Sequence, residues 1–268
     1  MTRQSAEPVL TGVVNFRDVG GLPTGDGRRV RHGVLFRSGH LAHATDADQA
    51  FLGALGLHTV FDFRNAADQD LDGHDVALPG VRHVNIPLND PAEGAAFWTL
   101  VRDGSLAELR AELTGRQAPG MMIASYRRMV LDRTAEHGRV LRTLSAGGVP
   151  ALLHCAAGKD RAGLTVALVL LAVGVERSAI VADYLKSNAP HRRYRLRRPG
   201  DGRPALPAEV AEVEGLLAPL FDARAEYLEA AFEQIDASWG GLDRYLGEGL
   251  GATDPERERL RDLLVTAA

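Results

Sequence analysis

The sequence contains few of the residues that mark disulfide-bonded, metal-binding or membrane-spanning proteins. A single cysteine among 268 residues excludes a disulfide within the chain. No stretch of about 18 uncharged apolar residues occurs, so no transmembrane helix is expected. The nine histidines lack ligand spacing such as H-E-x-x-H, and no metal site is predicted from them.

The same absences bear on location and partners. Residues 1–8 lack the apolar core of a signal peptide, and a lone cysteine suits a reducing compartment, so a cytoplasmic location is the default expectation. A net charge of −4 argues against general nucleic-acid binding, which usually needs a basic surface. We therefore expect neither a nucleic-acid partner nor a membrane span.

What the sequence does contain is typical of one globular α/β domain over residues 1–268. Hydrophobic residues make up 45% and charged residues 25% of the chain. Apolar runs predict sheet strands near Val34, Val60, Val84 and Leu152. A helix start is predicted at Thr45. Further helices are expected over residues 121–145, 176–187, 224–238 and 254–266.

One segment carries most of the functional information: His154-Cys155-Ala156-Ala157-Gly158-Lys159-Asp160-Arg161. The apolar run before it, residues 149–153, predicts a buried strand, and residues 162–171 predict a buried helix. The motif therefore lies on a strand-loop-helix turn, where the loop amides and the helix N-terminus favour a bound phosphate.

The residue types in this loop suit phosphate chemistry. Cys155 is expected to lose its proton readily beside a helix N-terminus and a cation, which favours the nucleophilic thiolate. Arg161 can hold two phosphoryl oxygens with its planar guanidinium group. Taken alone, Cys155 would more often be a small buried hydrophobic residue. The joint pattern of His-Cys, five residues and Arg between two apolar elements favours a phosphate-cleaving site.

This loop resembles the H-C-x5-R signature of the Cys-dependent protein tyrosine phosphatases, in particular a bacterial branch with the loop H-C-x-x-G-K-D-R. The resemblance covers nearly the whole chain, and it is weakest in the middle. The other matching segments are Asn15–Gly21, Gly33–Gly39, Phe61–Arg64, Val181–Asn188 and Glu226–Leu228. It implies a tyrosine-phosphatase-like fold with a parallel-rich central sheet flanked by helices. The branch includes an enzyme exported without a signal peptide, so export stays open.

The resemblance also implies a mechanism that needs no metal or other cofactor. Cys155 attacks phosphorus, and Arg161 and the loop amides stabilise the negative charge; a phosphocysteine forms and is then hydrolysed. His154 is expected behind the thiolate, hydrogen bonded to the backbone, as a support for the loop. The phosphate-binding residues are accordingly Ala156, Ala157, Gly158, Lys159, Asp160 and Arg161.

The general acid is left open between two aspartates. Asp160 lies inside the loop, where the branch also carries an aspartate, and it is either the acid or a structural hydrogen-bond acceptor. Asp90 follows the strand near Val84 and matches an aspartate that the branch places in a mobile loop. A third aspartate, Asp62, is expected to pair with an arginine and hold the end of its strand.

Two further loop positions bear on substrate and turnover. Lys159 would contact additional phosphates or a carboxylate, as lipid phosphatases with a similar loop use such a lysine for inositol phosphates, or would be an exposed, solvated lysine. Ala162 stands where the family normally has serine or threonine, whose hydroxyl stabilises the departing thiolate. This departure predicts slower hydrolysis of the phosphoenzyme, or compensation by another donor such as Thr165.

Two segments outside the loop are expected to modulate access. Residues 90–120 are apolar but poorly periodic and predict a lid-like insertion, which the branch builds from helices; a packed surface helix pair is the alternative. Residues 191–198 form a basic cluster that is either a solvated face or a guide for anionic substrates or an acidic lipid surface.

Together these features predict a phosphatase with a phosphocysteine intermediate. The first interpretation is a protein tyrosine phosphatase whose activity extends to phosphoserine or phosphoinositides. The second is a small-molecule phosphatase that acts on a nucleotide or sugar phosphate. A third, motivated by Ala162, is a weakly catalytic phosphate-binding module.

Overall fold

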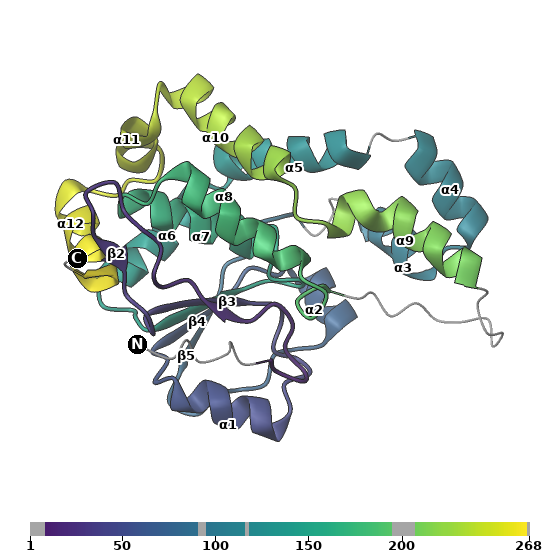
Figure 1. The fold of residues 1–268 in the computed structure, drawn as a ribbon, viewed down its shortest axis with the longest axis horizontal. Coiled ribbons are helices and arrows are strands. Elements are labelled where there is room, and N and C mark those ends of the chain that lie inside the picture. The colour runs from purple at the N-terminus through teal and green to yellow at the C-terminus, as the bar shows by residue number, and fades with distance from the viewer. Residues whose placement is uncertain (1–8, 91–94, 116–117, 195–206, 267–268) are drawn as a thin grey trace.

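A computed structural model describes residues 9–90, 95–115, 118–194 and 207–266. Its central feature is a five-stranded sheet in the order β1-β3-β6-β4-β5, parallel except for β1 (Figure 1). The strands are β1 (Arg17–Asp18), β3 (Leu35–Ser38), β4 (Thr59–Asp62), β5 (Arg82–Asn85) and β6 (Ala151–His154). The predicted parallel-rich sheet is confirmed, with a strand at or next to each predicted position.

Helices surround this sheet. They are α1 (Asp46–Ala54), α2 (Ala66–Asp72), α3 (Ala95–Asp103), α4 (Leu106–Gly115), α5 (Ala118–Asp132), α6 (Thr134–Ser145), α7 (Arg161–Ala172), α8 (Arg177–Leu185), α9 (Pro207–Phe221), α10 (Ala225–Trp239), α11 (Leu242–Arg244) and α12 (Asp254–Leu264), with a 3₁₀ turn η1 (Lys186–Asn188) and a π turn η2 (Tyr245–Gly249). No helix of the described residues is both long and apolar enough to span a bilayer.

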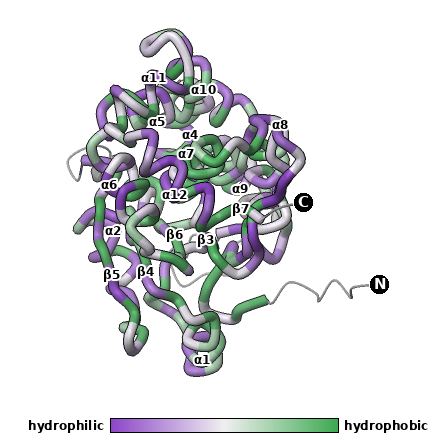
Figure 2. Tube along the Cα trace, turned by 90° about the vertical axis from the view of Figure 1, so that its left-hand side faces the viewer, coloured by the Kyte–Doolittle hydropathy of each residue, from purple (hydrophilic) through white to green (hydrophobic). Residues whose placement is uncertain are grey.

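The sheet is buried on both faces because successive residues of a strand point to opposite sides. Phe36, Val60 and Leu152 pack with Leu52 of α1 on one face. The other face carries Leu35, Phe61 and Leu153, which belong to the larger cluster containing all the apolar residues of α7. Figure 2 shows α7 as a hydrophobic stretch in the middle of the molecule, as its apolar sequence predicts.

Three predicted helices differ in detail from the structure. The expected helix 121–145 is two helices, because Arg133 leaves the helical conformation with φ −119° and ψ 29°. The break lets α5 pack against α10 while α6 packs against α7 and α12. The last expected helix ends at Leu264, since residues 265–266 form β7 (Val265–Thr266), which pairs with β2 (Arg29–Val30). Helix α8 also ends earlier than expected, in η1.

Helices α3, α4 and α9 form a separate group at one end of the molecule, beside α5 (Figure 1). Val101, Leu109 and Leu113 share a small apolar cluster with Leu217 and Leu220 of α9. The poorly periodic segment 95–115 therefore contains helices, and its apolar residues are buried against a helix about 100 residues later in the chain. The sequence did not predict α9.

Candidate active site

Cys155 follows β6, the middle strand of the sheet, where the chain turns into α7. Ligands of open parallel sheets bind beyond the carboxyl ends of the strands, because loops from neighbouring strands meet there. Asn65 follows β4 and Asn89 follows β5, and both lie with Cys155 around one cavity. The predicted strand-loop-helix turn is thus confirmed, and it lies at the edge where a ligand is expected.

The loop turns its carbonyl oxygens away from this cavity. The Ala156 carbonyl accepts a hydrogen bond from the His40 amide, at 3.1 Å. The Asn15 side-chain amide donates to the carbonyls of Ala157 and Gly158, at 3.1 and 3.0 Å. In a trans peptide the next N–H points opposite to the carbonyl. The amides after these carbonyls therefore face the cavity and form a nest for an anion.

The backbone conformation of the loop requires a glycine at position 158. Its φ is +65°, a conformation that side chains disfavour, and a Cβ atom there would lie 2.2 Å from the backbone of Ser38. Only a glycine allows the loop to lie this close to the end of β3.

A buried charge network fixes the outer side of the loop. Arg37 donates to the carbonyls of Gly158 and Lys159, at 2.8 and 3.2 Å. Arg17 bonds both carboxylate oxygens of Asp183, which also lies 3.6 Å from Arg37. Burial would raise the pKa of Asp183, but the charges of Arg17 and Arg37 lower it. Burial and the neighbouring Arg17 lower the pKa of Arg37 to about 10, so Arg37 stays cationic at neutral pH.

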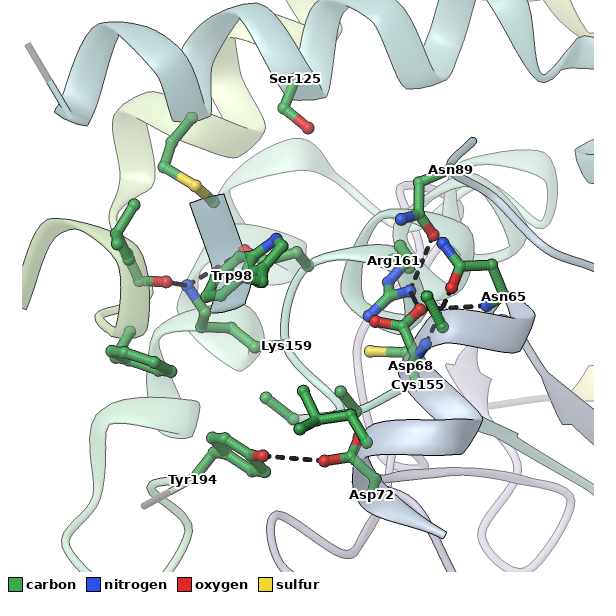
Figure 3. Close-up of a pocket in the computed structure, with 18 of the residues that line it drawn as sticks. Asn65, Asp68, Asp72, Asn89, Trp98, Ser125, Cys155, Lys159, Arg161 and Tyr194 are labelled. Atoms are coloured by element: carbon green, nitrogen blue, oxygen red, sulfur yellow. Dashed lines mark hydrogen bonds and ion pairs between the residues drawn. The ribbon is translucent and has the colours of Figure 1, made fainter. Parts of the chain in front are cut away.

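The cavity beyond the loop holds about 260 Å³. Cys155 is 2% exposed and lines it together with Arg161, and Figure 3 shows the two side chains next to each other on one side. Trp98 lies on another side, and Met122, Met129 and Phe221 add apolar walls. The cavity thus combines a thiol and a cation on one side with apolar side chains on another.

Two side chains that the sequence did not single out orient Arg161. Its Nη1 donates to Asp68 and to Asn89 Oδ1, the latter at 2.8 Å. Asp68 also closes the capping box of α2 with Asn65, which fixes its carboxylate. Burial would lower the pKa of Arg161, but the charges of Asp68 and Cys155 raise it above its ordinary value. The Asn65-x-x-Asp68 spacing, just after a strand, was the signal available in the sequence.

His154 lies behind the loop, but its imidazole does not bond the backbone as expected. Nε2 lies 3.0 Å from Asp75 Oδ2, and Nδ1 lies 3.7 Å from Asp62 Oδ1. Asp62 pairs with Arg64 at 3.0 Å, which confirms the expected arginine partner. Asp62, Asp75 and His154 could in principle chelate a metal ion. Arg64 contacts both carboxylates, however, so a cation already neutralises them.

Lys159 is not the exposed, solvated lysine of the second expectation, and it lines the cavity of Cys155, so contact with substrate stays a prediction. It is 4% exposed, and its ammonium group donates to the carbonyls of Leu220 and Asp222 at 2.9 Å each. It also lies 3.0 Å from Asp160 Oδ1. The side chain therefore ties the loop to the end of α9 and is shielded from solvent. This could not be predicted, because α9 was not.

The two candidate general acids, Asp160 and Asp90, lie in different parts of the surface. Asp160 lines the cavity, where Tyr126 donates to its Oδ1 at 2.8 Å. Asp90 is exposed and lines a different groove, with Arg133 and Arg139. Asp68 and Asp72 line the Cys155 cavity and were not among the candidates.

The hydroxyl of Thr165 is used inside α7. It donates to the carbonyl of Arg161 at 2.8 Å, and the residue is fully buried. Neither Thr165 nor Ala162 is among the residues that line the cavity. The structure therefore shows how the Thr165 hydroxyl is bonded, and compensation for the hydroxyl absent at Ala162 stays a prediction.

The described half of the basic cluster is partly exposed, at His191 and Arg193, and partly packed against the rest of the protein. Arg192 is 7% exposed, Arg193 forms an ion pair with Asp222, and Tyr194 lines the cavity. The ring of Tyr194 stacks on Phe221 at a centroid distance of 6.0 Å. Residues 195–198 lie outside the described residues.

The fold and the loop together define a Cys-dependent phosphatase site on a parallel α/β sheet. A family model described as "Tyrosine phosphatase family" matches residues 8–266. The chain therefore belongs to the tyrosine phosphatase family, and it is a phosphatase of the Cys-dependent type.

Two relatives that are similar in sequence, PtpB and a Cupriavidus necator protein, support this assignment. The triple specificity protein phosphatase PtpB of Mycobacterium tuberculosis is 35% identical over 276 residues, covering 96% of this chain and 98% of PtpB. A protein of Cupriavidus necator whose name places it among tyrosine-protein phosphatases is 34% identical, covering 89% of this chain and 82% of that protein. Pseudomonas aeruginosa TpbA is a solved structure at 18% identity and TM-score 0.30, covering 76% and 89% of the two chains. The resemblance drawn from the sequence is confirmed.

Proposed function

We propose that Cys155 is the nucleophile and that Arg161, with the amides of residues 156–161, binds the phosphoryl group. The observation that carries this proposal is one geometry: thiol, guanidinium group and inward-facing amides meet at the base of a single cavity at the N-terminus of α7. The thiolate attacks phosphorus as the ester bond breaks, and water then cleaves the phosphocysteine. His154 supports the loop from behind through Asp75.

We further propose an aryl phosphate, phosphotyrosine, as the preferred substrate. The apolar walls suit a phenyl ring. Asp68, Asp72 and Asp160 line the same cavity, and their carboxylates disfavour a substrate with further negative charges. Lys159 is held by α9 carbonyls and Asp160, so a second phosphate finds no free lysine in the loop. Phosphoserine is expected to turn over more slowly, and polyphosphorylated inositol lipids more slowly again.

We also propose that residues 90–120 act with α9 as a lid over this cavity. Trp98 and Thr99 of α3 and Leu220 and Phe221 of α9 contribute to its walls. Trp98 remains 38% exposed, so it lies where the cavity meets solvent. The lid excludes water around the reacting group, which strengthens the charge interactions at the base.

The proposal is tested by phosphate release in the presence of chelator, comparing wild type with Cys155→Ser. Phosphotyrosine peptide, phosphoserine peptide and a phosphoinositide are compared. We expect sustained release from wild type, in that order of rate, and loss of at least about 10³-fold in the variant, because oxygen replaces the thiolate. A phosphocysteine trapped by acid quench should appear in wild type alone. Equal release by both proteins would refute the role of Cys155.

A further inference from the structure

The three aspartates of the cavity differ in the partners that hold them. Asp68 accepts a hydrogen bond from Arg161, and Asp160 lies 3.0 Å from the ammonium group of Lys159. Protonating either carboxylate would break an ion pair. Asp72 instead accepts from a neutral phenol, Tyr194, at 3.0 Å. Figure 3 shows this pair in the lower part of the view, with Asp72 below Cys155 and Tyr194 reaching it from the left.

The surroundings of Asp72 favour a carboxylic acid. Asp72 is the last residue of α2 and is 8% exposed, and among the described residues no cation lies within ion-pair distance of it. The charged groups that act on it are Arg64, Asp68 and Arg161. Burial raises the pKa of Asp72, and the hydrogen bond from Tyr194 offsets only part of that rise. The negative end of the helix dipole acts in the same direction as burial.

We propose that Asp72 is the proton donor to the leaving group, oriented by the hydroxyl of Tyr194. This inference rests on the phosphocysteine mechanism proposed above. Tyr194 holds Oδ1, which leaves Oδ2 to carry the proton; among the described residues Oδ2 has no hydrogen-bond partner.

Protons balance in both steps, the formation of the phosphocysteine and its hydrolysis. As the sulfur–phosphorus bond forms and the phosphorus–oxygen bond breaks, the electron pair of the broken bond stays on the leaving oxygen, which takes the proton from Asp72. In the second step the Asp72 carboxylate accepts a proton from water, whose oxygen attacks phosphorus and displaces the Cys155 thiolate. The enzyme returns to its starting state without another reactant.

The test is Asp72→Asn, compared with wild type on two substrates. Phosphotyrosine has a poor phenolate leaving group that needs a proton, whereas p-nitrophenyl phosphate has a good one. We expect kcat/KM to fall by about 10²-fold or more on phosphotyrosine and by less than about 5-fold on p-nitrophenyl phosphate. Wild type should lose kcat/KM on phosphotyrosine as the pH rises and Asp72 loses its proton. This alkaline limb should be absent from the variant.

Several variants separate this role from others. Asp70→Asn changes an exposed residue of the same helix and should leave both substrates unaffected. Asp160→Asn and Asp90→Asn should not discriminate between the substrates. Tyr194→Phe, which keeps the carboxyl group but removes its orienting phenol, should cost about 10-fold on phosphotyrosine and less on p-nitrophenyl phosphate. It supplies the same test if Asp72→Asn does not fold.

An equal loss on both substrates in Asp72→Asn, or leaving-group discrimination in Asp160→Asn or Asp90→Asn instead, would overturn the assignment. The phosphatase mechanism would survive either result, because it depends on whether Cys155→Ser abolishes turnover of both substrates. The two proposals therefore fail independently.

Discussion

At the scale of single residues, two aspartates of the cavity show how the surroundings of a side chain decide its role. Asp160 and Asp72 both line the cavity, but one neighbours an ammonium group and the other a phenol. The sequence marks Asp160, because it lies inside the motif. It does not mark Asp72, because the partner Tyr194 lies 122 residues away. Residue type and local spacing therefore singled out the proposed nucleophile and arginine, whereas the acid that we propose depends on contacts that only the fold creates.

Ala162 gives the first prediction at this scale. It is fully buried in the first turn of α7, and the hydroxyl of Thr165 donates to the carbonyl of Arg161. Ala162→Ser should raise kcat by about 10-fold, because a hydrogen bond to a charged sulfur contributes about 1.5 kcal/mol or more to the breakdown of the phosphocysteine. Rapid-quench measurement of the burst and of steady turnover checks this.

The burst amplitude distinguishes the steps. Restored hydrolysis should shrink the accumulated phosphocysteine while the rate of its formation stays constant. A variant that folds, as judged by its melting temperature, yet keeps the wild-type burst and kcat would contradict the prediction. Ala167→Ser, further along the same buried helix, is the control for adding a hydroxyl to α7.

At the scale of elements, the strand-loop-helix turn around Cys155 was predictable from the sequence, whereas the packing of α3, α4 and α9 beside the cavity was not. Two apolar runs of different length bracket a polar motif, and such runs give strand and helix directly. The division between α5 and α6 was hidden because Arg133 is neither glycine nor proline. Helices were expected in segment 95–115, either as the lid implied by the family resemblance or as a packed surface pair, although the segment lacks a clean helical period. Their burial depends on α9, which lies far away in the sequence.

Lys159 joins two of these elements and supports the second prediction. Its ammonium group binds two carbonyls at the end of α9. Lys159→Met should speed amide hydrogen exchange in α9 by about 10-fold or more, since a hydrogen bond to a charged group contributes about 1.5–3 kcal/mol. Exchange in β6 should change much less. Mass spectrometry of peptides covering 207–221 measures this.

Lys186→Met is the matched control, because Lys186 is a half-exposed lysine that forms a 3.5 Å pair away from α9. Exchange in α9 that does not respond to Lys159→Met, or responds equally to Lys186→Met, would show that the loop lysine does not hold this helix.

At the scale of the whole molecule, the segments that resembled the family meet around one loop. Asn15, Arg37 and Asp183 come from three of those segments and lie on its outer side. The resemblance predicted that these segments matter but gave no reason. The structure supplies the reason: they hold the loop carbonyls on the outer side, so that the loop amides face the cavity.

The buried charge of Asp183 is expected to stabilise the whole fold. Asp183→Asn should reduce the free energy of unfolding by about 3–5 kcal/mol, because Arg17 and Arg37 lose their buried counter-charge. Asp236→Asn, which breaks a half-exposed pair with Arg177, should cost less than about 1 kcal/mol. Urea titrations at neutral pH compare the two.

The same pair predicts a dependence on pH. The pKa of Asp183 is lowered in the folded protein, so its contribution is complete above the unfolded value of about 4 and is lost as the pH falls through the folded value. The stability difference between wild type and Asp183→Asn should therefore shrink in acid. A difference that stays constant down to the acid transition would contradict the assigned charge pair.

The hydrogen bond from Asn15 to Ser187 spans 172 residues, so the site is closed by contacts between distant parts of the chain. Contacts of such sequence separation form late, because the intervening chain must be ordered first. A growing polypeptide thus has no working phosphatase until most of it has left the ribosome. An incomplete chain is therefore not an active phosphatase, which protects the cell. After dilution from denaturant, activity should return together with the slowest recovery of structure.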